Sequence, residues 1–319
     1  MTRQEKRGLA DLRAANRKNR LRKILAAKSK PNKHEETETT PGLVIAVGPG
    51  ICTVAIDGET RQCRCEFPVA PGDAVSIRHE KIAAIAPRRT ALSRTDPGNP
   101  NRDRVIAANI EVLVIVAAIE DPPFRPGFVD RYLIAAVRGG VQPVLCINKV
   151  DLCADTAAVG QVTDIWREMG VPVVLCSTRT GVGIDEVRDL LAGNLAVLAG
   201  HSGVGKSSLL NALADEPRAR TGAVSEVTHK GRQTTTSARL YELRNGARII
   251  DTPGIRELGL GRVTAAELRF AFTDFDAFEC RFRDCTHRTE PECGVRASVE
   301  SGAISKARYS SYLRIAGEL

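Results

Sequence analysis

Two nucleotide-binding motifs occur in this chain in the reverse of their usual order. The later one, Gly200–Ser207, fits the pattern Gly-x4-Gly-Lys-Ser, whose backbone amides surround phosphates while its lysine neutralises them. The earlier one, Asn148–Asp151, reads Asn-Lys-Val-Asp and carries an aspartate suited to the donor edge of guanine. Ordinary GTPases place the phosphate loop first, whereas here it starts 52 residues after Asn148. The order therefore predicts a circularly permuted nucleotide-binding fold.

The residues around both motifs favour this interpretation. Residues 195–199 form an apolar run that predicts a buried strand entering the phosphate loop, and residues 206–214 predict the helix that leaves it. Residues 143–147 predict a second buried strand that ends at Asn148, and the carboxyl ends of such strands bind ligands in α/β sheets. A glycine-rich structural turn and a solvated turn are the alternatives for the two motifs.

Further parts of a nucleotide site follow two more predicted strands. Residues 247–250 are apolar except for Arg248 and lead to Asp251, whose carboxylate would hold magnesium through water, and Gly254 would offer an amide to the γ-phosphate. The threonines at 234–236 would complete the magnesium shell, although a solvated β-edge explains such a run equally well. The turn at 177–181, after an apolar run at 173–176, predicts a second loop that contacts the base.

A cysteine-rich segment lies near the carboxyl end. Cys280, Cys285, His287 and Cys293 supply three thiols and an imidazole within 14 residues, a set suited to a closed, tetrahedral, structural zinc site. The single residue between Cys285 and His287 is a tighter spacing than that of ordinary zinc fingers, so unliganded cysteines are the alternative. The chain has nine cysteines, an odd number that favours reduced thiols and a metal over disulfides.

Length and composition agree with a multidomain protein. With 319 residues, 43% of them hydrophobic, the chain can form two or three domains with their own cores. It has no 18-residue apolar stretch and no secretory leader, so we expect a cytoplasmic protein that does not bind membranes.

The basic residues are concentrated at the start of the chain. Residues 1–33 contain 12 Lys and Arg against two acidic residues, a net charge of +10, whereas the whole chain carries +8. Such a segment is attracted to phosphate backbones, which predicts contact with nucleic acid. A solvated extension that only aids solubility, or a segment bound to a membrane surface, are the alternatives.

Residues 41–87 predict a small β-barrel. Short apolar runs at 42–47, 51–56, 61–65 and 74–77 alternate with turns rich in Gly, Pro and Asp. Barrels of this size commonly bind single-stranded nucleic acid by stacking bases on aromatic rings, but Phe67 is the only aromatic residue in this segment. Any RNA contact should therefore depend on backbone shape and on five arginines rather than on base stacking: Arg61, Arg64, Arg78, Arg88 and Arg89. Cys63 and Cys65 alternate along a predicted strand, which favours ordinary thiols over a metal site.

Taken together, the motifs and their order resemble those of the ribosome small subunit-dependent GTPase family known as RsgA or YjeQ, from about residue 41 to about residue 300. The resemblance is carried by Asn148–Asp151, Gly200–Ser208, Gly231–Thr236, Asp251–Glu257 and the Cys/His cluster. It implies a GTPase that binds the small ribosomal subunit late in maturation, is stimulated by it and leaves after hydrolysis. It also implies an OB-fold that contacts ribosomal RNA and a domain with one zinc ion.

The fold class expected from these observations is multidomain. A basic tail at 1–40 precedes an OB-like β-barrel at 41–90, a circularly permuted α/β P-loop GTPase domain at 105–258 and a helical zinc-binding domain at 259–319. The expected partners are the small ribosomal subunit with its RNA and GTP or GDP, and the protein is expected to be a monomer. A nucleotide-gated RNA-binding module, or a GTPase acting on another RNA-containing particle, is the alternative function.

Each motif residue can be given a role. Asp151 should accept hydrogen bonds from guanine N1 and N2, Lys149 should cover the base, and Asn148 should brace the loops. Lys206 should bridge the β- and γ-phosphates. The full set of expected nucleotide contacts is Asn148, Lys149, Asp151, Ser177, Thr178, Gly200, Ser202, Gly203, Val204, Gly205, Lys206, Ser207, Ser208, Asp251 and Gly254.

Magnesium and water need their own ligands. Ser207 should bind magnesium together with Thr235, which the register of the resembled family selects from the threonine run. The residue after Gly254 is Ile255, an apolar side chain that cannot orient water as the glutamine of many GTPases does. The resembled family places a histidine before the switch threonines, and Gln233 stands at that position here. Gln233, Lys206 and Thr235 are therefore the expected catalytic residues.

Overall fold

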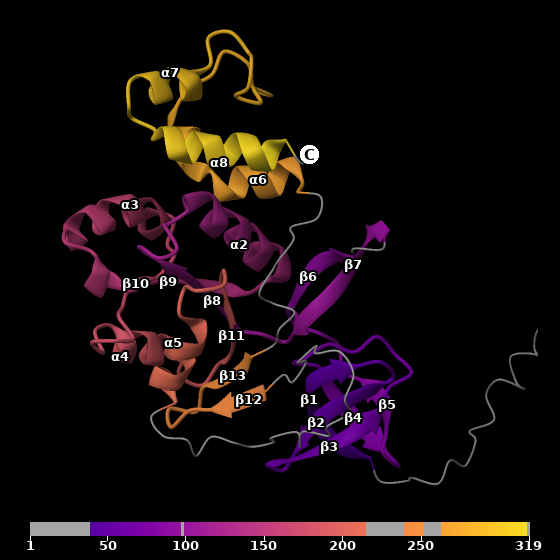
Figure 1. The fold of residues 1–319 in the computed structure, drawn as a ribbon. Helices are drawn as coiled ribbons and strands as arrows, with labels where there is room; N and C mark the ends of the chain where they lie inside the picture. The colour runs from indigo at the N-terminus through magenta and orange to yellow at the C-terminus, as the bar shows by residue number, and fades with distance from the viewer. Residues whose placement is uncertain (1–38, 97–98, 215–238, 252–262, 318–319) are drawn as a thin grey trace, which may run out of the picture. The chain divides into compact units, whose positions relative to one another are not determined.

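The computed structural model describes residues 39–96, 99–214, 239–251 and 263–317 (Figure 1). They form a closed β-barrel, a β-hairpin, an open six-stranded sheet with helices and a C-terminal group of helices. In this part of the chain, no helix is both long enough and apolar enough to span a bilayer.

The barrel has five strands, paired in the order β1-β2-β3-β5-β4 and closed by pairing of β1 with β4. The strands are β1 (Thr40–Gly48), β2 (Ile51–Ile56), β3 (Glu59–Arg64), β4 (Ala74–Arg78) and β5 (Lys81–Ile85). Alternate side chains of these strands, such as Val44 and Val54, fill the barrel core. The predicted small barrel is confirmed, and β5 is a strand that the sequence analysis missed. Cys63 is buried opposite Cys52 on β2, as an ordinary core thiol.

A hairpin follows the barrel. Its strands are β6 (Ala91–Asp96) and β7 (Asn99–Ala108), which pair antiparallel. Just before it, the Arg88 guanidinium binds both carboxylate oxygens of the fully buried Asp73 at 2.7 and 2.8 Å. Just after it, the Asn109 amide donates to the carbonyl of Gly72 at 2.9 Å. These polar contacts fasten the segments on either side of the hairpin to the barrel turn at Gly72 and Asp73.

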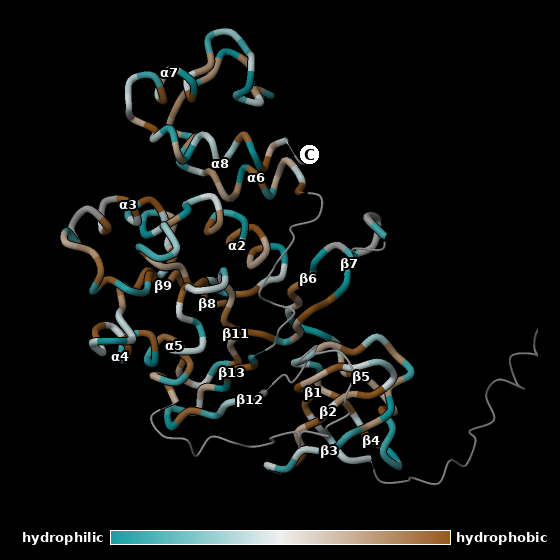
Figure 2. Tube along the Cα trace, viewed as in Figure 1, coloured by the Kyte–Doolittle hydropathy of each residue, from teal (hydrophilic) through white to brown (hydrophobic). Residues whose placement is uncertain are grey.

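The central sheet has the strand order β10-β9-β8-β11-β13-β12, parallel throughout except for β12. The strands are β8 (Val112–Ala118), β9 (Gln142–Asn148), β10 (Val173–Leu175), β11 (Leu195–Ala199), β12 (Arg239–Glu242) and β13 (Arg248–Asp251). Because helices cover both faces, the inner strands are continuous apolar runs rather than alternating ones (Figure 2). The strands predicted around 143–147, 173–176, 195–199 and 247–250 are confirmed.

The helices lie on the two faces of this sheet. They are α2 (Pro126–Gly139), the short η1 (Val150–Leu152), α3 (Thr156–Glu168), α4 (Ile184–Leu190) and α5 (Lys206–Leu213). Buried side chains of α2 and α3 share one apolar core, and those of α4 and α5 share the other. Helix α5 begins at Lys206, as the phosphate-loop motif predicts, and α2 begins with Pro126 in its first turn and ends at Gly140 in a left-handed cap.

Two of the C-terminal helices, α6 and α8, pack against α2. The C-terminal helices are α6 (Ala265–Ala271), η3 (Thr273–Ala277), α7 (Gly294–Glu300) and α8 (Lys306–Ala316). Glu267 forms the capping box of α6 with Thr264 and also binds the Arg138 guanidinium of α2 at 2.6 and 2.9 Å. The hydrogen bond from Arg138 outweighs partial burial and, with those from Thr264, lowers the pKa of Glu267 to about 2. This carboxylate therefore stays charged at physiological pH and joins α6 to α2.

A buried ion pair joins α8 to α2. The Asp130 side chain is 0% exposed and that of Arg308 is 4% exposed, and the guanidinium donates to the Asp130 carboxylate at 2.5 Å. Asp130 also accepts from Trp166 at 3.0 Å and Ser311 at 2.7 Å. Arg308 further binds Asp274 at 2.7 Å and lies over the Phe272 ring at 4.0 Å. Both charges are thus fully satisfied inside the protein.

Removing the guanidinium should therefore be costly. Arg308→Met would leave the Asp130 carboxylate buried and unpaired, so we expect unfolding to become easier by about 3–5 kcal/mol. Trp166, the only tryptophan and a partner of Asp130, reports urea unfolding directly by fluorescence. Arg314→Met, at an exposed position of the same helix, is the matched control and should change stability little. Equal stabilities of the two variants would contradict this role for the pair.

Candidate nucleotide site and metal centre

Four parallel strands end at one edge of the sheet, and each predicted motif follows one of them. Asn148 is the last residue of β9, Ser177 comes two residues after β10, Gly200 directly follows β11, and Asp251 ends β13. Since these strands run in the same direction, the loops after them lie together. Thr235, Gln233 and Gly254, and the basic tail, lie outside the residues that the structure describes.

Asn148 connects three of the loops. Its side chain is 0% exposed, and its amide donates to the carbonyl of Val204 in the phosphate loop at 2.9 Å. Its side-chain oxygen accepts from the amide of Thr178 at 3.2 Å and from the Cys176 thiol at 3.6 Å. A buried side chain with all its polar atoms engaged fixes the relative position of the loops.

The Asp151 carboxylate is held by the loop at residues 177–181, which follows β10 and is called the second base loop below because of its predicted role. The Ser177 hydroxyl donates to Asp151 at 2.5 Å and itself accepts from the amide of Thr180 at 3.2 Å. The Asp151 side chain is 15% exposed, and the guanidinium of Arg179 lies 3.8 Å from its second oxygen. The carboxylate is therefore oriented before any ligand binds, which lowers the entropic cost of recognition.

The segment between β8 and α2 forms a further wall of this region. Lys149, in a left-handed conformation with φ of 64°, donates through Nζ to the carbonyl of Asp121 and lies 3.5 Å from its carboxylate. A side chain at Gly203 would reach Pro122 at 3.6 Å. The sequence analysis missed this segment because it carries no motif, although its position after a parallel strand was a usable signal.

The phosphate loop is closely packed. Gly205 has φ of +93°, and a Cβ there would lie 2.2 Å from the Asn148 amide nitrogen, so only glycine fits. The Lys206 ammonium donates to the carbonyls of Gly200 at 2.7 Å and His201 at 2.6 Å. These two contacts fold the lysine back over its own loop, the position from which it can meet a bound phosphate.

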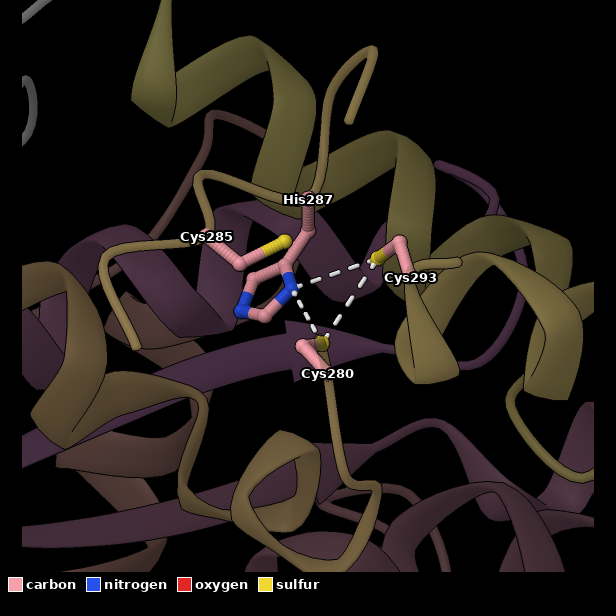
Figure 3. A group of neighbouring side chains, drawn as sticks. All are labelled: Cys280, Cys285, His287 and Cys293. Atoms are coloured by element: carbon pink, nitrogen blue, oxygen red, sulfur yellow. Dashed lines mark hydrogen bonds between the residues drawn. The ribbon is translucent and has the colours of Figure 1, made fainter. Parts of the chain in front are cut away.

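The Cys/His cluster forms a compact set of donors (Figure 3). The ligand atoms of Cys280, Cys285, His287 and Cys293 all lie within 4.8 Å of one another. His287 Nδ1 lies 3.5 Å from the sulfurs of both Cys280 and Cys293, which are 3.8 Å apart. A tetrahedral ion with metal–sulfur bonds of about 2.3 Å and metal–nitrogen bonds of about 2 Å needs edges of about 3.8 and 3.6 Å. The three separations among Cys280, His287 and Cys293 fit such an ion, and the Cys285 sulfur lies within 4.8 Å of the other donors.

Local backbone geometry and hydrogen bonds prepare Cys280, and burial prepares His287, as metal ligands, whereas burial raises the pKa of the Cys285 thiol to about 12. A Cβ at Gly294 would lie 2.2 Å from the carbonyl of Glu279, so glycine lets the Cys280 strand approach the start of α7. Burial would raise the pKa of the Cys280 thiol, but backbone hydrogen bonds from Val295 and Gly294 hold it below its usual value. Burial also lowers the pKa of His287, which favours the neutral imidazole that binds metals.

The loop between the ligands is held from two sides. The hydroxyls of Tyr309 and Tyr312 on α8 donate to the carbonyls of His287 at 2.6 Å and Thr286 at 2.8 Å. On the other side, the Glu290 carboxylate accepts from the amides of Thr286 at 2.8 Å and Arg288 at 2.9 Å. The loop that carries His287 is thus connected to α8 on one side and to Glu290 on the other.

Comparisons with known proteins agree with this geometry. The family model described as RsgA GTPase matches residues 85–261. A protein of Chlorobaculum tepidum named small ribosomal subunit biogenesis GTPase RsgA is 40% identical over 309 residues, covering 88% of this chain and 99% of that protein. The crystal structure of YjeQ from Thermotoga maritima has a TM-score of 0.64 and 29% identity, covering 87% of this chain and 97% of that one. The structure of YloQ, described as a circularly permuted GTPase, has a TM-score of 0.61 and 25% identity, covering 90% and 97%.

Cobalt(II) tests the metal centre directly. One equivalent of Co2+ should bind the purified protein and give the intense visible absorption of a tetrahedral thiolate site, because three thiols and one imidazole lie within 4.8 Å of one another. Cys285→Ser should lose most of this absorption. Cys153→Ser changes a half-buried thiol outside the cluster and is the matched control. An octahedral spectrum in the wild-type protein, or an unchanged one in Cys285→Ser, would contradict the assignment.

Proposed function

The chain belongs to the RsgA GTPase family, and from that premise we propose that it hydrolyses GTP and takes part in the biogenesis of the small ribosomal subunit. The observation that carries the proposal is the bridge made by Asn148, which joins the phosphate loop to the second base loop through Val204 and Thr178. It supports a single site in which one ligand contacts both loops, as a guanine nucleotide does.

The base would lie against the loops that follow β9 and β10. The Asp151 carboxylate accepts from guanine N1 and N2, with Ser177 holding its orientation. The stem of Lys149 would cover the ring face. The amide of Thr178, the expected donor to O6, already donates to the Asn148 side chain, so its part here is to hold that side chain in place. Adenine offers an acceptor at N1 and no amine at C2, so it would leave the carboxylate unpaired. This difference favours guanine nucleotides.

The phosphates would lie at the start of α5. Amides from Gly203 to Ser208 would surround the β-phosphate, and Lys206 would neutralise the β- and γ-phosphates. Ser207 and Thr235 would hold magnesium, with Asp251 acting through water, and the Gly254 amide would contact the γ-phosphate. Magnesium supplies positive charge that stabilises the transferring phosphoryl group. The chain's own contribution is to position these oxygens and amides around it.

The ion in the C-terminal cluster would be zinc. Three thiols and one imidazole within 4.8 Å of one another suit Zn2+, and all four positions would be occupied by protein, which leaves none for a reacting water. The ion would therefore stabilise the loop between η3 and α7. The resulting surface and the basic tail would contact the ribosomal subunit, with the tail held by phosphate charges.

Hydrolysis with purified ribosomal subunits tests the proposal. We expect multiple-turnover GTP hydrolysis to rise by at least about tenfold with small subunits and little with large subunits, because the subunit completes or orders the catalytic loops. Equal rates with either subunit would point to another RNA-containing particle. Hydrolysis that no subunit changes would favour a nucleotide-gated binding module.

Asp151→Asn should change base specificity. An asparagine amide donates where guanine also donates, so GTP affinity should fall by about 10- to 1000-fold while xanthosine triphosphate binds better than it does to the wild type. Isothermal titration calorimetry with both nucleotides measures the change. Asp155→Asn, outside the motif, is the control and should leave both affinities unchanged. Wild-type GTP affinity in Asp151→Asn would remove the residue from the site.

Gln233 is proposed to orient the attacking water. Its amide can donate to and accept from water without titrating, so the stimulated rate should be nearly constant from about pH 6 to 8. Gln233→Ala should lower stimulated turnover by about 10- to 1000-fold with little change in nucleotide affinity. Turnover like that of the wild type would mean that another group, such as one from the ribosome, positions the water.

A further inference from the structure

Helix α2 makes contacts in two directions that no nucleotide motif accounts for. One side of the helix carries Gly127 and, three and eleven residues after it, Asp130 and Arg138. All three residues contact the C-terminal helices. Phe128 and Tyr132 are four residues apart on a neighbouring side, and their rings are in contact at 4.4 Å. The same short helix therefore carries two separate sets of partners.

The ring pair of Phe128 and Tyr132 leads to the phosphate loop. The Phe128 ring packs on the His201 ring with a centroid distance of 4.2 Å and an angle of 34°. His201 is the second residue of the phosphate loop, and its carbonyl is one of the two that bind the Lys206 ammonium. On the other side of His201, a Cβ at Gly200 would lie 2.3 Å from the carbonyl of Val116 on β8. Movement of α2 would therefore shift the carbonyl that anchors Lys206.

The other set, on the side of α2 that carries Gly127 and Asp130, leads to the metal centre. Asp130 binds Arg308 and Ser311 of α8, and a Cβ at Gly127 would lie 2.9 Å from the Ser311 hydroxyl, so α2 and α8 are in close contact. From the same helix α8, Tyr309 and Tyr312 hold the carbonyls of His287 and Thr286. An ion that fixes His287 therefore also fixes the 286–287 loop that α8 contacts. Through α8 it restrains the side of α2 that carries Asp130.

We propose that α2 couples the metal centre to the nucleotide site, with Phe128 as the positioning residue that acts on the phosphate loop through His201. Metal binding orders the 286–287 loop and α8, α8 holds α2, and α2 seats the phosphate loop with Lys206 in place. Nucleotide binding acts in the reverse sequence: it orders the phosphate loop, which restrains α2, and α2 restrains α8 and the 286–287 loop. The inference rests on the proposed binding of guanine nucleotides, but it does not require the ribosome.

Coupling of this kind has a thermodynamic signature. If Zn2+ raises the affinity for GDP by some factor, GDP must raise the affinity for Zn2+ by the same factor. Ring packing of Phe128 on His201, the buried hydrogen bonds of Asp130 and the part-buried tyrosine hydroxyls form a continuous series of contacts, so we expect a factor of at least about five, the lower end of typical coupling. A role of α2 that is only structural would change overall stability without producing this reciprocity.

The test uses the full-length protein and four titrations. GDP affinity is measured by calorimetry with the protein loaded with Zn2+ and after its removal by a chelator, and Zn2+ affinity by chelator competition with and without saturating GDP. In the wild-type protein, Zn2+ should raise the GDP affinity by the same factor by which GDP raises the Zn2+ affinity. If GDP binds equally well with and without Zn2+, and Zn2+ equally well with and without GDP, the proposal is overturned. GDP binding, and hence the proposed function, would remain intact. Absence of GDP binding to the loaded protein would instead remove the proposed function.

Variants locate the coupling on α2. Phe128→Ala should reduce the factor to about one while zinc still binds stoichiometrically, and Phe128→Tyr, which keeps the ring, should restore it. Tyr309→Phe combined with Tyr312→Phe removes only the two hydroxyls at the metal end and should also weaken the coupling. Phe270→Ala removes a ring of α6 that is 52% exposed and should leave it unchanged. A full wild-type factor in both Phe128→Ala and the double tyrosine variant would overturn the assignment.

Discussion

The rest of the structure depends on one constraint, the parallel pairing of five strands in the order β10-β9-β8-β11-β13. It brings the ends of strands that are far apart in sequence to one edge of the sheet, so that Asn148 can reach the carbonyl of Val204, 56 residues later, at 2.9 Å. Hydrogen bonding between strands does not depend on the order in which the chain visits them. A circular permutation can therefore keep the site while changing which elements follow it.

The changed connections leave α2 between two functional regions. In this chain the base-binding strands come first, and the C-terminal helices return to α2 through Asp130 and Arg308, 178 residues apart. Burying this pair costs solvation, and the partners Trp166, Ser311 and Asp274 offset that cost by satisfying the remaining polar atoms. The result is a specific attachment of the metal-binding region to the nucleotide-binding region, rather than a flexible connection.

Features that depend on local sequence were predictable. The phosphate loop, the start of α5 at Lys206 and the strand ending at Asn148 follow from short motifs and apolar runs. The four cysteine and histidine ligands follow from residue type and spacing, and the structure brings them within 4.8 Å. In each case the residues that define the feature lie within about 15 positions of one another, so that composition and spacing carry the information.

Features that depend on long-range packing were not predictable. The strand β5 has the sequence Lys-Ile-Ala-Ala-Ile and only one buried residue in five positions, Ile82, which gives little periodicity. The ion pair of Asp130 with Arg308 and the ring contact of Phe128 with His201 join residues with no local pattern, because a single charge or ring on a helix looks the same whether it is solvated or paired. Only the tertiary fold selects the partner.

The central claim is that one guanine nucleotide binds across loops supplied in permuted order. A crystal structure of the protein with GDP and magnesium tests it most directly. The account predicts both Asp151 carboxylate oxygens within about 3 Å of guanine N1 and N2, and the β-phosphate within about 3 Å of the amides after Gly200 and of Lys206 Nζ. A nucleotide bound away from Asp151, or with its phosphates outside the loop between β11 and α5, would contradict it.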